Sequence, residues 1–461
     1  MNGVLAGIAV YIAAQLAIGA WASRRIQSEE DYLLAGRSLG YGLALFTIFA
    51  TWFGAETVVG AAGAVYENGL SGGSADPFGY GLCILLMGAV FAVPLWRRKL
   101  TTFADLFRQR YSIGVERFAV FLMVPTSILW AAAQVRAFGQ VLSASSSLEV
   151  ELTISIAACV VIVYTVAGGL LADAITDLVQ GAALIVGLVV LGVALAIAGG
   201  FDGLREIEPA RFALFGGGEV PVLEVMEAWA IPIFGSVVAA ELVARVIAAR
   251  SPSVARRACF YGGGLYLVVG LIPVALGLVG PSLLPDLVHG EQILPRLALE
   301  YLPPVIYIAF AGALLSAILS TVDSALLVSA SLVSHNIVLP LRRDMSEAGK
   351  VRLARAGVVG LGGLAYVLAL HAEGVYDLVH QASAFGSAGI FVVTSMGLFT
   401  GLGGARAAHC SLAAGAGAWI IGSYVLALPT AYLTALGLSA AAYALGAAWE
   451  LATSRERATA G

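Results

Sequence analysis

Long runs of apolar residues, separated by short clusters of charged and turn-forming residues, extend along almost the whole chain. Most of these runs contain about 20 residues or more, the length that an α-helix needs to cross the hydrocarbon core of a bilayer. The pattern therefore predicts an all-α polytopic membrane protein with thirteen transmembrane helices. The predicted spans are residues 3–22, 40–66, 78–96, 117–145, 151–171, 175–199, 223–247, 258–281, 304–338, 353–371, 376–400, 407–427 and 430–450.

The positions of the Lys and Arg residues give an independent test of these spans, because basic residues concentrate in cytoplasmic loops. With the N-terminus outside, all but four of the 25 basic residues fall in loops on one side. Arg205, Arg211 and Arg296 fall on the other side, and Arg136 falls within a span. The alternation predicts an odd number of spans, an outer N-terminus and a cytoplasmic C-terminus in a plasma or inner membrane.

The composition agrees with a membrane protein. Of the 461 residues, 60% are apolar and only 12% are charged, whereas a soluble chain has about 25% charged residues. Such a chain could not cover a water-exposed surface, which excludes a soluble enzyme, a nucleic-acid-binding protein and a disordered scaffold. The longest predicted loops, 200–222 and 282–303, are too short for a separate domain. We therefore expect residues 1–461 to form one transmembrane domain, with no obligate protein partner evident.

Two predicted spans carry helix-breaking residues beside an acidic residue. The second span has Gly54 two residues before Glu56, and the seventh has Pro232 and Gly235 shortly before Glu241. In secondary transporters, interrupted helices at corresponding positions of two inverted repeats indicate the solute and ion site. Gly and Pro are also common in ordinary membrane helices, but here the two interruptions lie five spans apart.

This spacing predicts two five-helix units of opposite orientation. The predicted repeats cover residues 40–199 and 223–400, and the predicted peripheral helices cover 3–22, 407–427 and 430–450.

The ninth span contains a second polar group of residues. Ser320 and Thr321 follow Ala317 by three and four positions, so their hydroxyls come close to its carbonyl on a helix. Oxygen ligands without nitrogen or sulfur suit a hard cation. Alternatively, the hydroxyls bond only to their own helix. Asp323 favours a functional role, because ionisable residues within spans usually face an interior or a pathway.

Several short tracts, in this order and spacing, resemble those of a known family. They are 31–37, 50–52, 64–66, 130–133, 164–165, 168–170, 176–177 with Gln180, 245–246 and 312–336. The family is the sodium/solute symporter family, and the pattern is most similar to its high-affinity choline transporter branch. The resemblance covers roughly residues 29–400 and implies a fold of two inverted five-helix repeats.

The resemblance also implies a site for Na⁺. Its ligands would be backbone carbonyls of Ala50, Phe53 and Ala317 and the hydroxyls of Ser320 and Thr321.

Two carboxylates are candidates for a second cation site or for coupling, namely Asp177 and Asp323. The family links the position of Asp177 to such a role. Alternatively, Asp177 is a carboxylate at the start of a helix, where the helix dipole stabilises negative charge.

The solute pocket is expected between the two broken helices. Trp52, Tyr80 and Trp130 match aromatic positions with which the choline branch holds a quaternary ammonium, by cation–π attraction. Ala239 stands where that branch has a further tryptophan, which leaves the cage open on one side. Aromatic residues at helical spacing are also often packing residues.

Three charged residues differ from the pattern of the choline branch, namely Glu56, Glu241 and Arg136. A buried charge needs a partner, so Arg136 is expected either to pair with Glu56 or Glu241 or to contact a polar solute. The full set of expected pocket residues is Trp52, Glu56, Thr57, Tyr80, Trp130, Arg136, Ala239 and Glu241.

Together these features predict a sodium-coupled symporter that imports a small organic solute by alternating access. The alternatives are a transport-inactive sensor with the same fold, a symporter coupled to protons, and a membrane-embedded enzyme. The sequence has no paired His ligands, nucleophile elbow or phosphate loop that would favour an enzyme.

Overall fold

The computed structural model describes residues 27–459 except 145, 147, 168, 219, 343 and 373, with a few isolated positions before residue 27. The described residues contain helices and no β-strand, only one isolated bridge between Leu39 and Ala249. Helices of the first half are α2 (Glu29–Leu34), α3 (Tyr41–Trp52), η2 (Glu56–Ala61), α4 (Ala62–Asn68), η4 (Ser74–Gly79), α5 (Tyr80–Leu86), η5 (Met87–Phe91), α6 (Ala92–Arg97), α7 (Asp105–Arg110), α8 (Ile113–Ala144), α9 (Val150–Ala167) and α10 (Leu170–Ile197). Those of the second half are α11 (Val222–Ala230), η9 (Ile231–Gly235), α12 (Ala240–Ala248), α13 (Pro252–Leu283), η10 (Gly290–Gln292), α14 (Ile293–Tyr301), α15 (Pro304–Ser331), η11 (Leu332–Val338), α16 (Glu347–His371), α17 (Val375–Ala384), α18 (Ser387–Phe399), α19 (Ala405–Ile420), η13 (Ile421–Val425) and α20 (Ala431–Thr459).

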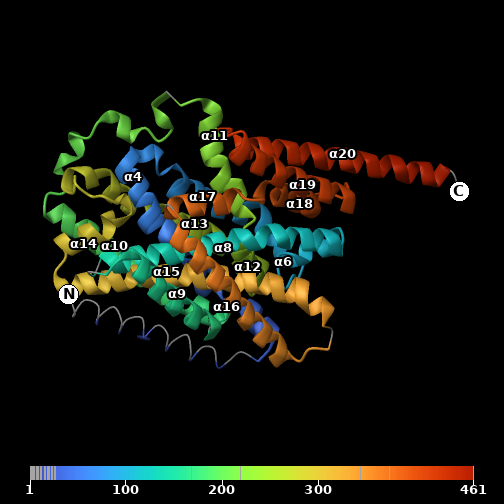
Figure 1. Cartoon of the computed structure of the whole chain (residues 1–461), viewed down its shortest axis with the longest axis horizontal. Coiled ribbons are helices and arrows are strands. Elements are labelled where there is room, and N and C mark those ends of the chain that lie inside the picture. The colour runs from blue at the N-terminus through green and yellow to red at the C-terminus, as the bar shows by residue number, and fades with distance from the viewer. Residues whose placement is uncertain are drawn as a thin grey trace.

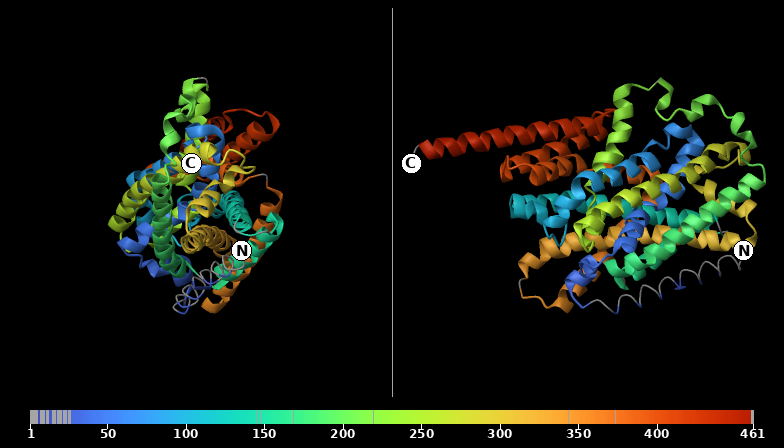
Figure 2. Two further views of the ribbon diagram at one scale, coloured as in Figure 1. Left: turned by 90° about the vertical axis from the view of Figure 1, so that its left-hand side faces the viewer. Right: turned by 180° about the vertical axis from the view of Figure 1, so that it is seen from behind.

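The long helices lie side by side along one axis of the molecule (Figure 1), and α20 extends beyond the other helices at one end (Figure 2). Helix α8 is central, because it packs against α9, α15, α16 and α17. Helix α15 also packs against α10, and α13 packs against α3 and α4. These contacts surround the two broken segments, α3–η2 and η9–α12.

Burial separates the central helices from the outer ones. In the most apolar stretches of α8 and of the α15–η11 segment, 72% and 78% of the residues are buried, against 33% in α10 and 28% in α16. The exposed side chains of α10 are largely aliphatic, such as Val186 and Val193. An apolar surface of this kind matches a hydrocarbon solvent, so α10 and α16 are placed to face lipid.

Among the described residues, nine helices are long and apolar enough to cross a membrane, or ten with the bent pair Tyr41–Trp52 and Glu56–Ser71. Each predicted span after the first falls on a helix or a broken helix, although α9 and α19 are shorter than the rest. The predicted span 3–22 lies almost wholly outside the described residues. A count of thirteen therefore stays a prediction.

The predicted boundary between the fifth and sixth spans is wrong. Residues 172–174 were expected to separate the two spans, but they belong to α10, which begins at Leu170. The chain turns instead at Gly169, whose φ of 125° is accessible to glycine because it has no Cβ. The interruptions predicted in the second and seventh spans are present. The second span bends by 46° after Trp52, and residues 236–239 separate η9 from α12.

Close packing between α13 and α4 depends on Gly277. A Cβ at this position would lie 2.5 Å from the carbonyl oxygen of Ala62, which belongs to the backbone and cannot rotate away. We expect Gly277→Ala to lower the free energy of unfolding by about 1–3 kcal/mol through overpacking, measured by SDS titration of the purified protein. Gly264→Ala on the same helix is the control, since nothing lies within 4 Å of its Cβ. Equal stability of the two variants would contradict this packing.

Candidate functional site

The break after α3 brings three helices together. Helix α3 ends at Trp52, Phe53 leaves helical geometry with φ −85° and ψ 60°, and η2 begins at Glu56. A Cβ on Gly54 would lie 2.4 Å from Oγ1 of Thr321 on α15 and 2.9 Å from Oε1 of Gln134 on α8. Only glycine permits this approach, so Gly54 sets the position of the break against α15 and α8.

Residues predicted to bind sodium are brought together at this contact. The hydroxyl of Thr321 donates to the carbonyl of Ala50 at 3.2 Å and to that of Ala317 at 3.3 Å. Phe53 ends α3 next to Gly54, and Ser320 precedes Thr321 on α15. All of these residues are buried, with exposures of 2% or less. The donor set is entirely oxygen, the chemistry that a hard cation such as Na⁺ prefers, and the residues present fit such an ion.

Ser320 connects this group to Asp177. The hydroxyls of Ser320 and Thr47 both donate to the carboxylate of Asp177, which is fully buried. Asp323, one turn further along α15, is also fully buried, and neither of its oxygens has a hydrogen-bond partner among the described residues. Asp177 does not lie at a solvated helix start, because α10 begins seven residues earlier.

A neighbouring ion pair was not foreseen from the sequence. Arg245 of α12 pairs with Asp173 of α10, and both side chains are completely buried. Ser324 donates to Asp173 at 2.9 Å. The sequence counted Arg245 among the cytoplasmic basic residues; α12 buries it in the bundle, and the side of the membrane on which it lies stays a prediction. The i, i+4 spacing of Asp173 and Asp177 was the available signal, since it places both carboxylates on one helix face.

The side chain of Gln134 forms hydrogen bonds both with the backbone at the helix break and with a carboxylate. Its Oε1 accepts from the N–H of Ala55 at 2.9 Å, and its Nε2 donates to Oε2 of Glu56 at 2.8 Å. Glu56 is 1% exposed, and its Oε1 has no partner among the described residues. A free amide in hydrocarbon costs several kcal/mol, so this side chain stabilises the interruption of the helix.

Asp76 is a second central carboxylate, which the sequence analysis missed. Its Oδ2 accepts from Thr57 at 2.8 Å and from the hydroxyl of Tyr266 at 2.9 Å. The Tyr266 hydroxyl also lies 3.2 Å from the carbonyl of Trp52. Asp76 was overlooked because the third span was predicted to begin at residue 78. The signal was an acidic residue between apolar tracts, directly before Pro77.

Three predicted aromatic residues form one cluster. The ring of Trp130 lies 5.7 Å from that of Trp52 and 5.9 Å from that of Tyr80, centroid to centroid. The hydroxyl of Tyr80 lies 2.9 Å from Oγ of Ser383 on α17. All three side chains are buried, so the cluster is closed to bulk water.

Other predicted pocket residues lie apart from this cluster. Ala239 and Glu241, beside η9 and α12, line a small separate cavity of about 20 Å³ together with Ser127 of α8. Arg136 donates to the carbonyl of Ala369 and lines a larger cavity of about 520 Å³. The ion pairs given for the described residues do not include one between Arg136 and Glu56 or Glu241, and the role of Arg136 stays a prediction.

The larger cavity lies at the end of the bundle where α16 finishes and α17 begins. Its polar lining includes Glu67, Arg136, Gln140, Glu291 and Asp377. Glu291 accepts from the N–H of Val375 at 2.7 Å. Burial raises the pKa of Glu291, although this hydrogen bond and the charge of Arg136 oppose the rise.

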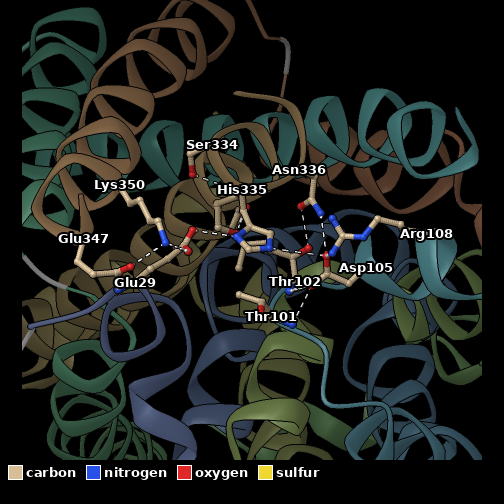
Figure 3. A network of polar contacts seen from close by, with 12 residues as sticks. Glu29, Thr101, Thr102, Asp105, Arg108, Ser334, His335, Asn336, Glu347 and Lys350 are labelled. Atoms are coloured by element: carbon tan, nitrogen blue, oxygen red, sulfur yellow. Dashed lines mark hydrogen bonds and ion pairs between the residues drawn. The ribbon is translucent and has the colours of Figure 1, made fainter. Parts of the chain in front are cut away.

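Polar contacts close the opposite end of the bundle (Figure 3). His335 of η11 lies 2.9 Å from Glu29, and Thr102 donates to Asn336 at 2.7 Å. Asn336 donates to Asp105 and Glu116, and the backbone N–H of Glu29 donates to Glu347 of α16 at 3.0 Å. The contacts join α2, α7, α8, η11 and α16. Since α16 contains 25 residues, at 1.5 Å per residue these contacts lie roughly 35 Å from the larger cavity.

Comparison with known proteins gives consistent matches. The profile described as "Sodium:solute symporter family" matches residues 32–415. The human high affinity choline transporter 1 is 30% identical over 413 residues, covering 83% of this chain and 70% of the relative. The sodium/pantothenate symporter of Haemophilus influenzae is 27% identical over 334 residues, covering 69% and 68%.

A solved structure has the same fold. It is a Na⁺-coupled sialic acid symporter in a substrate-bound outward-open state, with a TM-score of 0.84 and 18% identity, covering 96% of each chain. This similarity shows that the present chain has the fold of that structure.

The Asp173–Arg245 pair should be critical for stability. Asp173→Ala leaves a buried, unpaired guanidinium, and we expect it to lower the free energy of unfolding by about 3–5 kcal/mol, measured by SDS titration. Glu30→Ala, which breaks the more exposed pair with Arg37, should cost less than about 1 kcal/mol. In the double variant Asp173→Ala/Arg245→Met, the loss should be smaller than in Asp173→Ala alone. An additive loss would show that the two charges do not interact.

Proposed function

Because the chain belongs to the sodium:solute symporter family, we propose that it imports a small organic solute together with sodium by alternating access. Its relatives are transporters rather than enzymes. Transported solutes named for the relatives include choline and pantothenate, one a cation and the other an acid. Family membership therefore leaves the solute to be inferred from the residues of this chain.

The proposed sodium ligands are the carbonyls of Ala50, Phe53 and Ala317 and the hydroxyls of Ser320 and Thr321. The observation that supports this site is the contact of the Thr321 hydroxyl with the Ala50 and Ala317 carbonyls. Sodium in this position would join the broken α3 to α15 and hold the two elements in one arrangement. Asp177 and Asp323 are proposed as a second cation site or a coupling element, since the hydroxyl of Ser320 contacts Asp177.

The proposed solute pocket lies beside the break in α3. Trp52, Trp130 and Tyr80 supply its aromatic side, and Glu56 and Thr57 supply polar groups. Arg136 would meet the solute earlier, in the outer cavity, whereas Ala239 and Glu241 would line the path on the inner side.

The conformation supports an outward-facing assignment. A cavity of about 520 Å³ opens at one end, and polar contacts join five elements at the other end. With the N-terminus outside, the cavity faces the exterior and the contact network faces the cytoplasm. The proposed architecture has thirteen helices, with inverted repeats at 40–199 and 223–400, in the plasma or inner membrane.

The driving force follows from the charge of the ion. Each sodium that moves inward gains about 2.3 kcal/mol per 100 mV of membrane potential, in addition to its concentration gradient. Removal of sodium from the α3–α15 contact at the cytoplasmic side would release the constraint that favours the outward-facing arrangement. Solute release would follow at the inner face.

The sodium site can be tested without knowledge of the solute. Sodium that binds the folded protein should raise its unfolding temperature. We expect Thr321→Ala to raise the half-saturating sodium concentration at least tenfold, about 1.4 kcal/mol, and Ser320→Ala/Thr321→Ala to abolish the effect. Ser329→Ala on α15 is the matched control, because among the described residues its hydroxyl bonds only to the carbonyl of Leu326. An unchanged sodium response in the double variant would refute the assignment.

The proposed topology is tested by cysteine labelling. After replacement of Cys83, Cys159, Cys259 and Cys410, single cysteines are placed at the exposed positions Glu208 and Asp344. An impermeant maleimide added to intact cells should label Glu208→Cys and should reach Asp344→Cys only after permeabilisation. The reverse pattern would invert the orientation, and labelling of both in intact cells would contradict the span count.

A further inference from the structure

We propose that the solute is an organic cation carrying N–H groups, held by the carboxylates of Glu56 and Asp76. The inference rests on the proposed function, because it assigns the solute class of the same pocket. It differs from the choline-like solute that the aromatic cluster alone would indicate, since a quaternary ammonium carries no N–H group.

Each of the two carboxylates has one satisfied and one unsatisfied oxygen. Glu56 Oε2 accepts from Gln134 and Asp76 Oδ2 accepts from Thr57 and Tyr266. Glu56 Oε1 and Asp76 Oδ1 have no hydrogen-bond partner among the described residues, although both side chains are only 1% exposed. Buried polar atoms are rarely left unpaired in folded proteins, so these oxygens indicate a missing donor.

The two carboxylates also lack a positive counterpart. No ion pair between described residues includes Glu56 or Asp76. The fully buried Arg245 pairs with Asp173, and Arg136 donates to the carbonyl of Ala369 and lines the outer cavity. Charged groups within a bilayer normally pair with one another or mark a solute or ion path. A cationic solute would supply the missing charge.

The aromatic cluster adjoins these carboxylates. Trp130 lies four residues before Gln134 on α8, so the indole and the amide that binds Glu56 share one helix face. The carbonyl of Trp52 and the carboxylate of Asp76 both contact the hydroxyl of Tyr266. The indole N–H of Trp52 is also without an acceptor among the described residues.

These groups together describe one ligand chemistry. An ammonium or guanidinium group would lie against the aromatic faces and donate N–H bonds to Glu56 Oε1 and Asp76 Oδ1. An oxygen on the same solute could accept from the Trp52 indole. A quaternary ammonium would keep the cation–π attraction but leave both carboxylate oxygens unpaired, and that costs binding energy.

A methylation series measures this difference directly. Ethanolamine, N-methylethanolamine, N,N-dimethylethanolamine and choline carry three, two, one and no N–H groups on one skeleton. Binding to the full-length protein in nanodiscs with sodium is measured by the rise in unfolding temperature and by competition with radiolabelled ethanolamine. We expect affinity to fall along the series, with ethanolamine at least tenfold tighter than choline, about 1.4 kcal/mol.

Substitution of each carboxylate tests whether it causes the preference for ethanolamine over choline. Glu56→Gln and Asp76→Asn keep the shape of each side chain but remove its charge, and each should reduce the ethanolamine preference at least threefold. Glu227→Gln is the matched control, because Glu227 is a buried carboxylate that accepts from the backbone N–H groups of Tyr432 and Leu433. It should leave the preference unchanged. A cooperative unfolding transition of each variant without added ligand verifies that it is folded.

Three results would overturn the inference. Choline could bind as tightly as ethanolamine, or none of the four amines could bind while sodium still stabilises the protein. Alternatively, Glu56→Gln could remove a sodium response while amine affinity does not depend on the number of N–H groups. This result would mean that the carboxylates hold a second ion. A loss of all sodium response in the wild-type protein would instead refute the proposed function.

Discussion

The central constraint on this protein is that a helix broken inside the bilayer must find partners for the backbone groups that it releases. Hydrocarbon offers no hydrogen bonds, so the neighbouring helices must supply them. Gln134 of α8 binds the free N–H of Ala55, and Thr321 of α15 contacts the carbonyl of Ala50. Both contacts require Gly54, where a side chain would collide with these two residues. The same contacts that stabilise the break also collect the oxygen atoms of the proposed sodium site.

The buried charges differ in how far they are compensated, and this difference separates structural from ligand-binding roles. Asp173 and Arg245 neutralise one another between α10 and α12. Glu227 receives two backbone N–H bonds at the start of α20. Glu56, Asp76, Glu241 and Asp323 retain oxygen atoms without a partner and take part in no ion pair among the described residues. Because an uncompensated charge is costly in a membrane, these carboxylates are the groups for which an ion or a solute provides a physical reason.

The two ends of the bundle are built in different ways. At one end, Arg136 and Glu291 line an open cavity. At the other, the Glu29, Asp105, His335 and Asn336 side chains connect elements that are far apart in the sequence. Hydrogen bonds and ion pairs can be exchanged without loss of a packed apolar core, so a polar closure suits an end that must open during transport. Alternating access requires such a two-state element.

The sequence alone determined the membrane class, the positions of most long apolar helices, the two interruptions and the grouping of Ala317, Ser320 and Thr321. These features depend on hydropathy, helix breakers and spacing along one helix, and all of them are local properties of the chain. Only the tertiary structure brought Gln134 to the break, paired Asp173 with Arg245, revealed Asp76 and moved Arg136 to the outer cavity. Those relations depend on how each helix is rotated and offset against its neighbours. Apolar packing within a bilayer sets that rotation, and a single helix sequence does not encode which neighbour its polar side chain will meet.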